Sequence, residues 1–218
     1  VEAGHDVLPF CAENIRKDAN RTMAEMRIEI LTDSPVTHLE KNRVAIAGKE
    51  PRFIDTSTLV WAAGVKSNDL IAALDAKKDR IGRISVDSHL KVYDFPGVFA
   101  VGDCAHFQTE KMPHPLPQTG QVAVQEASCL VENIVRNIEG RPMKPFSYRE
   151  LGSMVSLGER TAVSNIFGYI GLSGFIGWLS WKLVYLKHLM GILRKPRVVL
   201  DWFFDITYDR EASRHKFG

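Results

Sequence analysis

Along the first hundred residues, apolar and polar side chains alternate in short runs that end at turn residues. Alternation with a period of two is typical of strands, and turns such as Asp-Ser-Pro and Gly-Lys-Glu-Pro separate the runs. We expect strands over the residue ranges 27–31, 36–40, 43–47, 52–55 and 58–64. A helix over 13–26 precedes this meander, and a shorter helix over 67–74, with Ser67 as its N-cap, follows it.

The middle of the chain changes from short strands to one long helix. Residues 82–87 and 90–94 have strand patterns, a Pro-Gly turn follows at 96–97, and the apolar run 98–101 predicts a buried strand. After two prolines at 115 and 117, helical spacing continues from 118 to 139, where Gly140 and Pro142 end it. Small and apolar residues near its start, from Val122 to Leu130, indicate that this helix is buried there.

The last third of the chain is unusually apolar. Residues 146–166 predict a strand, a turn at 158–159 and a second strand, and no charged residue occurs from 161 to 181. That length approaches a bilayer span, but serines and four glycines interrupt it, so we expect a strand, a turn and an apolar helix over 172–193. The helix carries four aromatic residues, Phe175, Trp178, Trp181 and Tyr185, and the basic segment 194–197 and the apolar run 198–204 follow it.

This tail resembles an interfacial membrane anchor, with aromatic rings at the depth of the headgroups and cations toward anionic lipid. A buried core or a homodimer interface, and a true membrane span, remain alternatives for the same helix. The contact is expected to be peripheral and monotopic, at the cytoplasmic face of the cell membrane.

Composition narrows the classes of function. The chain has 218 residues, 45% hydrophobic and 25% charged, which suits a globular protein with one large or two small cores. A net charge of +2 argues against a nucleic-acid partner. Three distant cysteines, Cys11, Cys104 and Cys129, have neither zinc-ligand nor disulfide-framework spacing, the seven histidines show no ligand spacing, and we expect no metal site.

The candidate chemistry begins at VFAVGDCAH, residues 98–106, where four apolar residues run into Gly102 and Asp103. A glycine there lets the backbone approach a ligand, and the carboxylate can accept hydrogen bonds from a polyol or ribose hydroxyl. On the dipeptide alone, an ordinary turn is the simpler interpretation.

The longer string DFPGVFAVGDCA, residues 94–105, resembles the C-terminal flavin motif of the glutathione-reductase-like flavoproteins, which have two dinucleotide-binding domains. The resemblance implies that Asp103, with Gly102, meets the ribityl chain of FAD. TLVWAAGVKSN, residues 58–68, is similar to the segment where such chains return to the flavin domain, which places Ala63 and Gly64 on the nicotinamide side.

Within these flavoproteins, the chain resembles the type II NADH dehydrogenases, which are single-subunit NADH:quinone oxidoreductases. PLPQTGQVAVQ, residues 115–125, looks like the family's AQxAxQ quinone-site motif, with Gly120 and Gln118 as departures from the usual residues. The resemblance implies that Gln121 and Gln125, on one helix face, orient the quinone, and that Gln121 and Val122 also line the cofactor. Neutral amides suit this task because a quinone presents two carbonyl oxygens in apolar surroundings.

Glu2 is expected to bind the adenosine ribose of the dinucleotide. VEAGHDVLP, residues 1–9, resembles the end of the second strand of a dinucleotide fold, where an acidic residue favours NADH over NADPH. No GxGxxG fingerprint occurs in the chain, so both fingerprints of the family are expected upstream of Val1. We therefore expect the C-terminal half of a longer enzyme, inactive by itself.

These inferences combine into one prediction of an α/β fold. We expect the remainder of an NADH-binding domain over 1–82, the C-terminal part of a Rossmann-like FAD domain over 83–146, and strands plus amphipathic membrane-anchoring helices over 147–218. The predicted activity passes a hydride from NADH to FAD and two electrons on to a membrane quinone, without proton pumping. A sulfide:quinone reductase, which would need Cys104 and Cys129, and a non-catalytic binding module are the alternatives.

Overall fold

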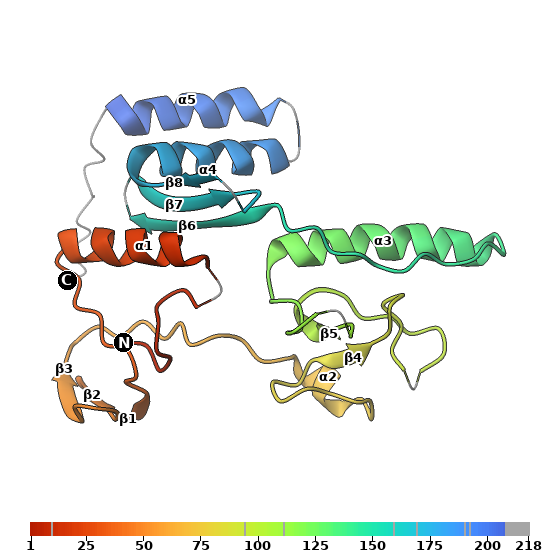
Figure 1. The fold of residues 1–218 in the computed structure, drawn as a ribbon, viewed down its shortest axis with the longest axis horizontal. Coiled ribbons are helices and arrows are strands. Elements are labelled where there is room, and N and C mark those ends of the chain that lie inside the picture. The colour runs from red at the N-terminus through yellow and green to blue at the C-terminus, as the bar shows by residue number, and fades with distance from the viewer. Residues whose placement is uncertain are drawn as a thin grey trace, which may run out of the picture. The chain divides into compact units, whose positions relative to one another are not determined.

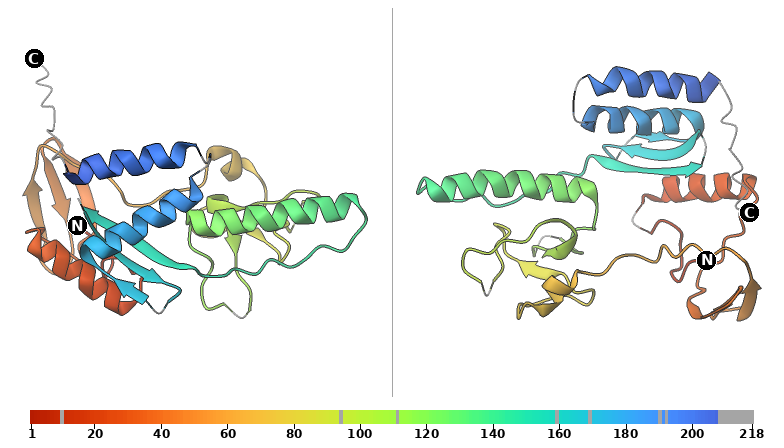
Figure 2. Two further views of the ribbon diagram at one scale, coloured as in Figure 1. Left: turned by 90° about the horizontal axis from the view of Figure 1, so that it is seen from above. Right: turned by 180° about the vertical axis from the view of Figure 1, so that it is seen from behind.

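The computed structural model describes residues 1–9, 11–93, 95–110, 112–158, 160–168, 170–189, 191 and 193–207, without the side chains of 205–207. Its contacts divide the chain into two compact units (Figures 1 and 2). One unit joins Val1–Leu59 with Glu150–Gly218, and the other is Val60–Arg149.

The first unit contains a three-layer sandwich. Its middle layer is an antiparallel sheet in the order β6 (Gly152–Gly158), β7 (Thr161–Ile166) and β8 (Ile170–Leu172). Helix α1 (Glu13–Glu25) covers one face and helix α4 (Gly174–His188) the other, and α5 (Arg194–Thr207) lies beyond α4 (Figure 1). Because successive residues of a strand point to opposite faces, Val163 packs against α1 while Ala162 and Ser164 meet α4.

Helix α4 approaches the sheet very closely at Gly177. A Cβ atom added there would lie 2.3 Å from the carbonyl oxygen of Ala162, so only glycine permits this packing. Ser164 donates a hydrogen bond to the Gly177 carbonyl at 3.2 Å, and Ser180 donates to the same carbonyl at 2.7 Å. The serines inside the apolar run therefore belong to a helix–sheet interface.

The meander of the first unit is shorter than the alternating pattern predicted. Strands β1 (Val36–Glu40), β2 (Arg43–Ile46) and β3 (Arg52–Asp55) form an antiparallel sheet in that order. No strand forms over 27–31 or 58–64, and Val60 and Trp61 are 82% and 60% exposed. An apolar run becomes a strand only beside a neighbour that completes its hydrogen bonds, and among the described residues no strand pairs with either of these two runs.

The second unit has one core around a small parallel pair of strands. Strand β4 (Ile84–Val86) pairs with β5 (Ala105–Phe107), which directly follows η1 (Gly102–Cys104), a single 3₁₀ turn. Residues 91–92 and 99 form only isolated bridges rather than the two strands expected there. The core residues come from both strands, from α3 (Gly120–Ile138) and from the segment after it: Ile84, Val86, Leu90, Val92, Ala100, Ala105, Phe107, Leu116, Val122 and Phe146.

The short helix α2 (Asp69–Ala73) begins one residue later than predicted. Its N-cap is Asn68, whose side chain accepts a hydrogen bond from the Leu70 N–H at 2.9 Å. Ser67 was the wrong choice, since its hydroxyl is buried and has no hydrogen-bond partner among the described residues. Ile71 and Leu74 pack against the core of the second unit, which begins at Val60.

A segment that we call the strap, residues 141–149, returns along α3 in extended form (Figure 1). Phe146 anchors its middle, because its ring meets Phe107 edge-on at 5.1 Å and its N–H donates to the Ser88 carbonyl at 2.7 Å. The strap leads from α3 to the boundary residue Arg149, where the second unit ends.

Candidate functional site

The predicted flavin motif forms a tight turn at the start of η1. Gly102 has a φ of +69°, and a Cβ atom there would lie 3.3 Å from the Cβ of Ala123 in α3. Glycine is the residue that tolerates both conditions. The next residue, Asp103, is exposed, so its carboxylate is available to a ligand.

Helix α3 holds this turn with two polar side chains. Gln118, just before the helix, donates a hydrogen bond from Nε2 to the Asp103 carbonyl at 2.8 Å. Glu126, two turns into the helix, accepts one from the Gly102 N–H at 2.5 Å. The turn and the start of α3 are therefore fixed relative to each other.

Glu126 is a buried carboxyl group that the sequence analysis missed. It is only 1% exposed, and its burial raises the pKa of Glu126, although the hydrogen bond from Gly102 works in the opposite direction. The signal was present in the helix, because Glu126 stands on the same face as the core residue Val122 and the partly buried Cys129. An acidic residue on the apolar face of a helix is therefore a candidate for holding a neighbouring turn through a hydrogen bond.

The two glutamines of the quinone motif lie on α3. Both are half-buried and lie one turn apart. The amide of Gln125 makes two hydrogen bonds to one residue of the strap: Nε2 donates to the Arg149 carbonyl at 2.9 Å, and Oε1 accepts from the Arg149 N–H at 3.0 Å. These two bonds fix the orientation of the Gln125 amide against the strap.

Val122, expected at the cofactor, has its side chain in the core, 3% exposed. Its N–H donates to the side chain of Thr119, the N-cap of α3, at 3.4 Å. Only its main chain is therefore placed to line a ligand.

The other expected cofactor residues lie outside regular elements. Ala63 and Gly64 are exposed, and Gly64 has a φ of +99°. Glu2, in the first unit, accepts a hydrogen bond from the Gly4 N–H at 2.7 Å, while its own N–H donates to the Leu31 carbonyl. The structure thus brings Gly102, Asp103 and the α3 residues together within the second unit.

A second cluster, also missed from sequence, secures the segment before α3. Arg83 is 7% exposed and donates from Nε to Asp79 at 2.7 Å and from Nη1 to the Leu116 carbonyl at 2.9 Å. Burial opposes ionisation of Asp79, but hydrogen bonds from the Arg83 main chain and guanidinium and from His106 outweigh it and lower the pKa of Asp79. Spacing alone could have suggested the Asp79–Arg83 pair, but not its burial.

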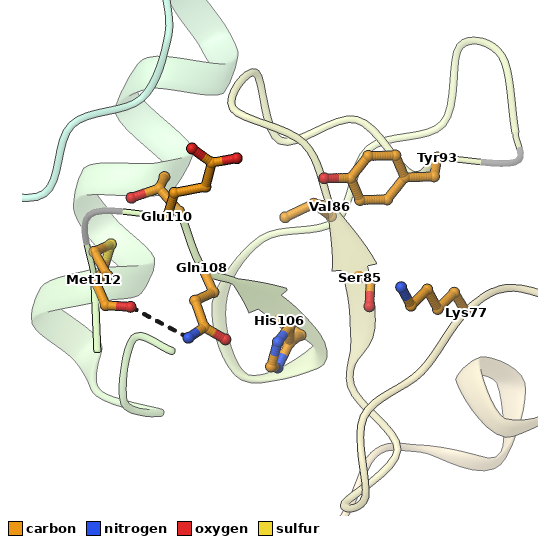
Figure 3. Close-up of a pocket in the computed structure, with 9 residues that line it drawn as sticks. Lys77, Ser85, Val86, Tyr93, His106, Gln108, Glu110 and Met112 are labelled. Atoms are coloured by element: carbon orange, nitrogen blue, oxygen red, sulfur yellow. Dashed lines mark hydrogen bonds between the residues drawn. The ribbon is translucent and has the colours of Figure 1, made fainter. Parts of the chain in front are cut away.

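A polar pocket of about 390 Å³ opens beside the β4–β5 pair (Figure 3). Ser85 and Val86 come from β4 and His106 from β5, and Gln108 bonds to the Met112 carbonyl at its edge (Figure 3). None of the predicted cofactor or quinone residues lines it. The pocket is thus distinct from the turn at Gly102.

The comparisons with known proteins agree with this arrangement. Residues 1–127, more than half of the chain, match the family described as pyridine nucleotide-disulphide oxidoreductase. The chain belongs to that family. Residues 151–211 match the NDH2 C-terminal domain, which agrees with the resemblance to the type II NADH dehydrogenases that the sequence indicated.

Individual relatives support the same assignment. The chain is 30% identical to a probable NADH dehydrogenase of Dictyostelium discoideum, over 98% of this chain and 46% of the relative. It is 29% identical to a type II NADH:quinone oxidoreductase of Mycobacterium tuberculosis, over 93% of this chain and 44% of that protein. The chain therefore spans less than half the length of these relatives.

The fold also matches a solved structure, that of NDH2 from Plasmodium falciparum in complex with NADH. The TM-score is 0.81 at 19% identity, over 96% of this chain and 57% of the other. The α/β fold of the predicted flavoprotein class is thereby confirmed.

The turn at Gly102 fits the part of FAD that the family implies. An exposed carboxylate at Asp103 can accept hydrogen bonds from the hydroxyls of a ribityl chain, and the absence of a side chain at Gly102 keeps the backbone accessible. The chemistry of these two residues is therefore compatible with a ribityl chain.

Proposed function

We propose that this chain forms the FAD-contacting and quinone-contacting part of an NADH:quinone oxidoreductase. The observation that carries the proposal is the pair of hydrogen bonds, from Gln118 and to Glu126, that hold the turn at Gly102 against helix α3. They keep the carboxylate proposed to bind the ribityl chain beside the helix that bears Gln121. The match of residues 151–211 to the NDH2 C-terminal domain supports it.

When bound, FAD would take a hydride from NADH and pass two electrons to a quinone. The chain's own residues bind and orient. Asp103 would hold the ribityl hydroxyls, Ala63 and Gly64 would leave room on the nicotinamide side, and the Glu2 carboxylate would accept hydrogen bonds from the NADH ribose.

Gln121 is the residue that we assign to the quinone. Its neutral amide can donate to a quinone carbonyl without burying a charge, and it stands in the first turn of α3, close along the chain to the turn-binding Gln118. Nothing in this part of the site requires proton translocation.

Membrane contact is the second part of the proposal, and α5 with the outer side of α4 is its expected surface. In the described residues no helix is long and apolar enough to cross a bilayer. The large apolar side chains that these helices and their link expose are Phe175, Ile176, Leu179, Leu183, Val184, Tyr185, Leu193, Val199, Leu200, Phe203 and Phe204.

The charges at the start of α5 support the same orientation. Arg194, Lys195 and Arg197 stand in its first turn, where no acidic residue accompanies them. Cations there oppose the helix dipole, so an external anionic surface such as lipid headgroups would stabilise them. We place this contact at the cytoplasmic face of the cell membrane.

One residue of the expected anchor is corrected by the structure. Trp178 is only 7% exposed, so its ring cannot lie among headgroups. Lys182 connects it to α5, with Nζ 4.9 Å from the Trp178 ring centroid and 4.6 Å from that of Trp202. Trp178 and Lys182 therefore take part in the contact between the two helices.

The surroundings of Cys129 argue against the alternative of a sulfide:quinone reductase. That chemistry needs a reactive thiolate, and burial raises the pKa of Cys129, with the charge of Glu132 adding to the effect. Cys104 donates to the Val101 carbonyl at 3.3 Å beneath the turn.

The first test uses the protein expressed from its own start codon. We expect a yellow protein whose flavin is bleached by NADH and reoxidised by a quinone. Gln121→Ala should slow quinone reduction at least tenfold, while NADH still bleaches the flavin. A colourless protein would refute the proposal and favour a binding module.

The second test is flotation with liposomes that contain anionic lipid. The wild-type protein should float with the liposomes, and the double variant Leu200→Glu/Phe203→Glu should remain in the dense bottom fraction. Both side chains are more than half exposed, so the new charges would face the lipid. Flotation unchanged by these substitutions would contradict the assignment. If the variant instead changed a dimer into a monomer, the face would be a homodimer interface.

A further inference from the structure

Two amide side chains of α3 each form a matched pair of hydrogen bonds with the main chain of the strap. Asn133 donates to the Lys144 carbonyl at 2.8 Å and accepts from the Lys144 N–H at 2.8 Å. Gln125 does the same with Arg149 at 2.9 and 3.0 Å. In each case a side-chain amide pairs with the main chain as a neighbouring strand would.

The two pairs hold very different parts of the strap. Near Lys144, Asn133 is fully buried, and Arg136 adds a hydrogen bond to the Pro142 carbonyl at 3.1 Å. Phe146 is fixed by its ring contact and by Ser88. At Arg149, the last residue of the second unit, the bonds to the main chain that the structure describes come from Gln125.

We infer that Gln125 is a positioning residue, which acts on the quinone site by holding the end of the strap beside Gln121. The pair commits the Gln125 Oε1 to the Arg149 N–H and one Nε2 hydrogen to the Arg149 carbonyl, which fixes the plane of the amide against the strap. The strap main chain at Arg149 then forms a wall of the quinone site one helical turn from Gln121. This inference rests on the proposed function for its quinone part, but not for the strap.

The experiment compares three variants of the full-length, flavin-loaded protein. Gln125→Met keeps the length of the side chain and removes both hydrogen bonds. Gln125→Glu keeps the acceptor for the Arg149 N–H and loses the donor. Gln108→Met is the matched control, because Gln108 bonds only locally, to the Met112 carbonyl, and lies in the separate pocket.

Hydrogen exchange of peptides that cover residues 144–152 measures the strap directly. Gln125→Met should exchange about tenfold faster near Arg149, since two hydrogen bonds are lost, and Gln125→Glu should be intermediate. The same Gln125→Met protein should show a severalfold higher KM for quinone with little change in kcat and in flavin bleaching by NADH. Gln108→Met should change none of these.

Each result decides one part of the inference. A higher KM for quinone with unchanged exchange would mean that Gln125 binds the quinone directly, and would overturn the inference. Faster exchange with unchanged quinone kinetics would make the pair purely structural and would also overturn it. If NADH failed to bleach the wild-type flavin, the proposed function and the quinone part would fall, whereas the exchange data would still decide whether Gln125 holds the strap.

Discussion

Replacing Arg83 should destabilise the second unit far more than a comparable change at the surface. In Arg83→Met, the Asp79 carboxylate, whose side chain is 14% exposed, loses its guanidinium partner, and the Leu116 carbonyl loses its donor. A hydrogen bond to a charged group contributes about 1.5–3 kcal/mol, and an unsatisfied buried acceptor costs about 1–3 kcal/mol. Since burial of the methionine offsets part of this, we expect a loss of about 3 kcal/mol, within the range for a broken buried pair.

Urea unfolding followed by circular dichroism would measure this loss. Arg141→Met is the control, because the Arg141–Glu139 pair is about half exposed on both sides and should contribute less than about 1 kcal/mol. The double variant Asp79→Asn/Arg83→Met should be more stable than Arg83→Met alone, since the amide oxygen still accepts from the Ile81 and Arg83 N–H groups and no unpaired charge remains. A loss below about 1 kcal/mol in Arg83→Met, or a double variant less stable than the single one, would refute the reasoning.

Two further predictions concern Glu126 and Gly177. Because burial raises the pKa of folded Glu126, its contribution to stability is full below the ordinary glutamate pKa and is lost as pH rises through the raised pKa. The unfolding free energy of the wild type relative to Glu126→Gln should therefore fall with rising pH in a series of urea titrations, and a flat or opposite trend would contradict the assignment. Gly177→Val should lower the free energy of unfolding by about 1–3 kcal/mol or more, since the valine Cβ would lie 2.3 Å from the Ala162 carbonyl oxygen. Gly120→Ala, where an added Cβ meets nothing within 4 Å, is the control, and equal melting temperatures for both variants would contradict the packing argument.

The pattern of the sequence predicted most elements where each pattern could be satisfied locally. Helix α3 begins and ends within two residues of the prediction, because Thr119 caps it and Gly140 follows it. The strand over 58–64 did not form, because a strand depends on partners that the pattern of one segment cannot show.

The candidate site was predictable where the residue types of a motif indicate the chemistry, as at Gly102 and Asp103. It was not predictable where the side chain's task is set by a distant segment. Gln125 has the residue type of a quinone ligand, yet its amide meets Arg149, 24 residues away. Glu126 and Arg83 likewise became interpretable only when their burial was known.

The paired hydrogen bonds of Asn133 and Gln125 also fix the number of residues in the strap between Lys144 and Arg149. Between them the helix advances by eight residues, about 12 Å, while the strap covers the same stretch with the five residue steps from Lys144 to Arg149, about 16 Å if fully extended. The strap could therefore lose fewer than two residues and still span the distance between the two pairs. Insertions and deletions should therefore be accepted in the turn around Gly140 and rejected between Lys144 and Arg149, so the length of this short stretch should be harder to change than its side chains.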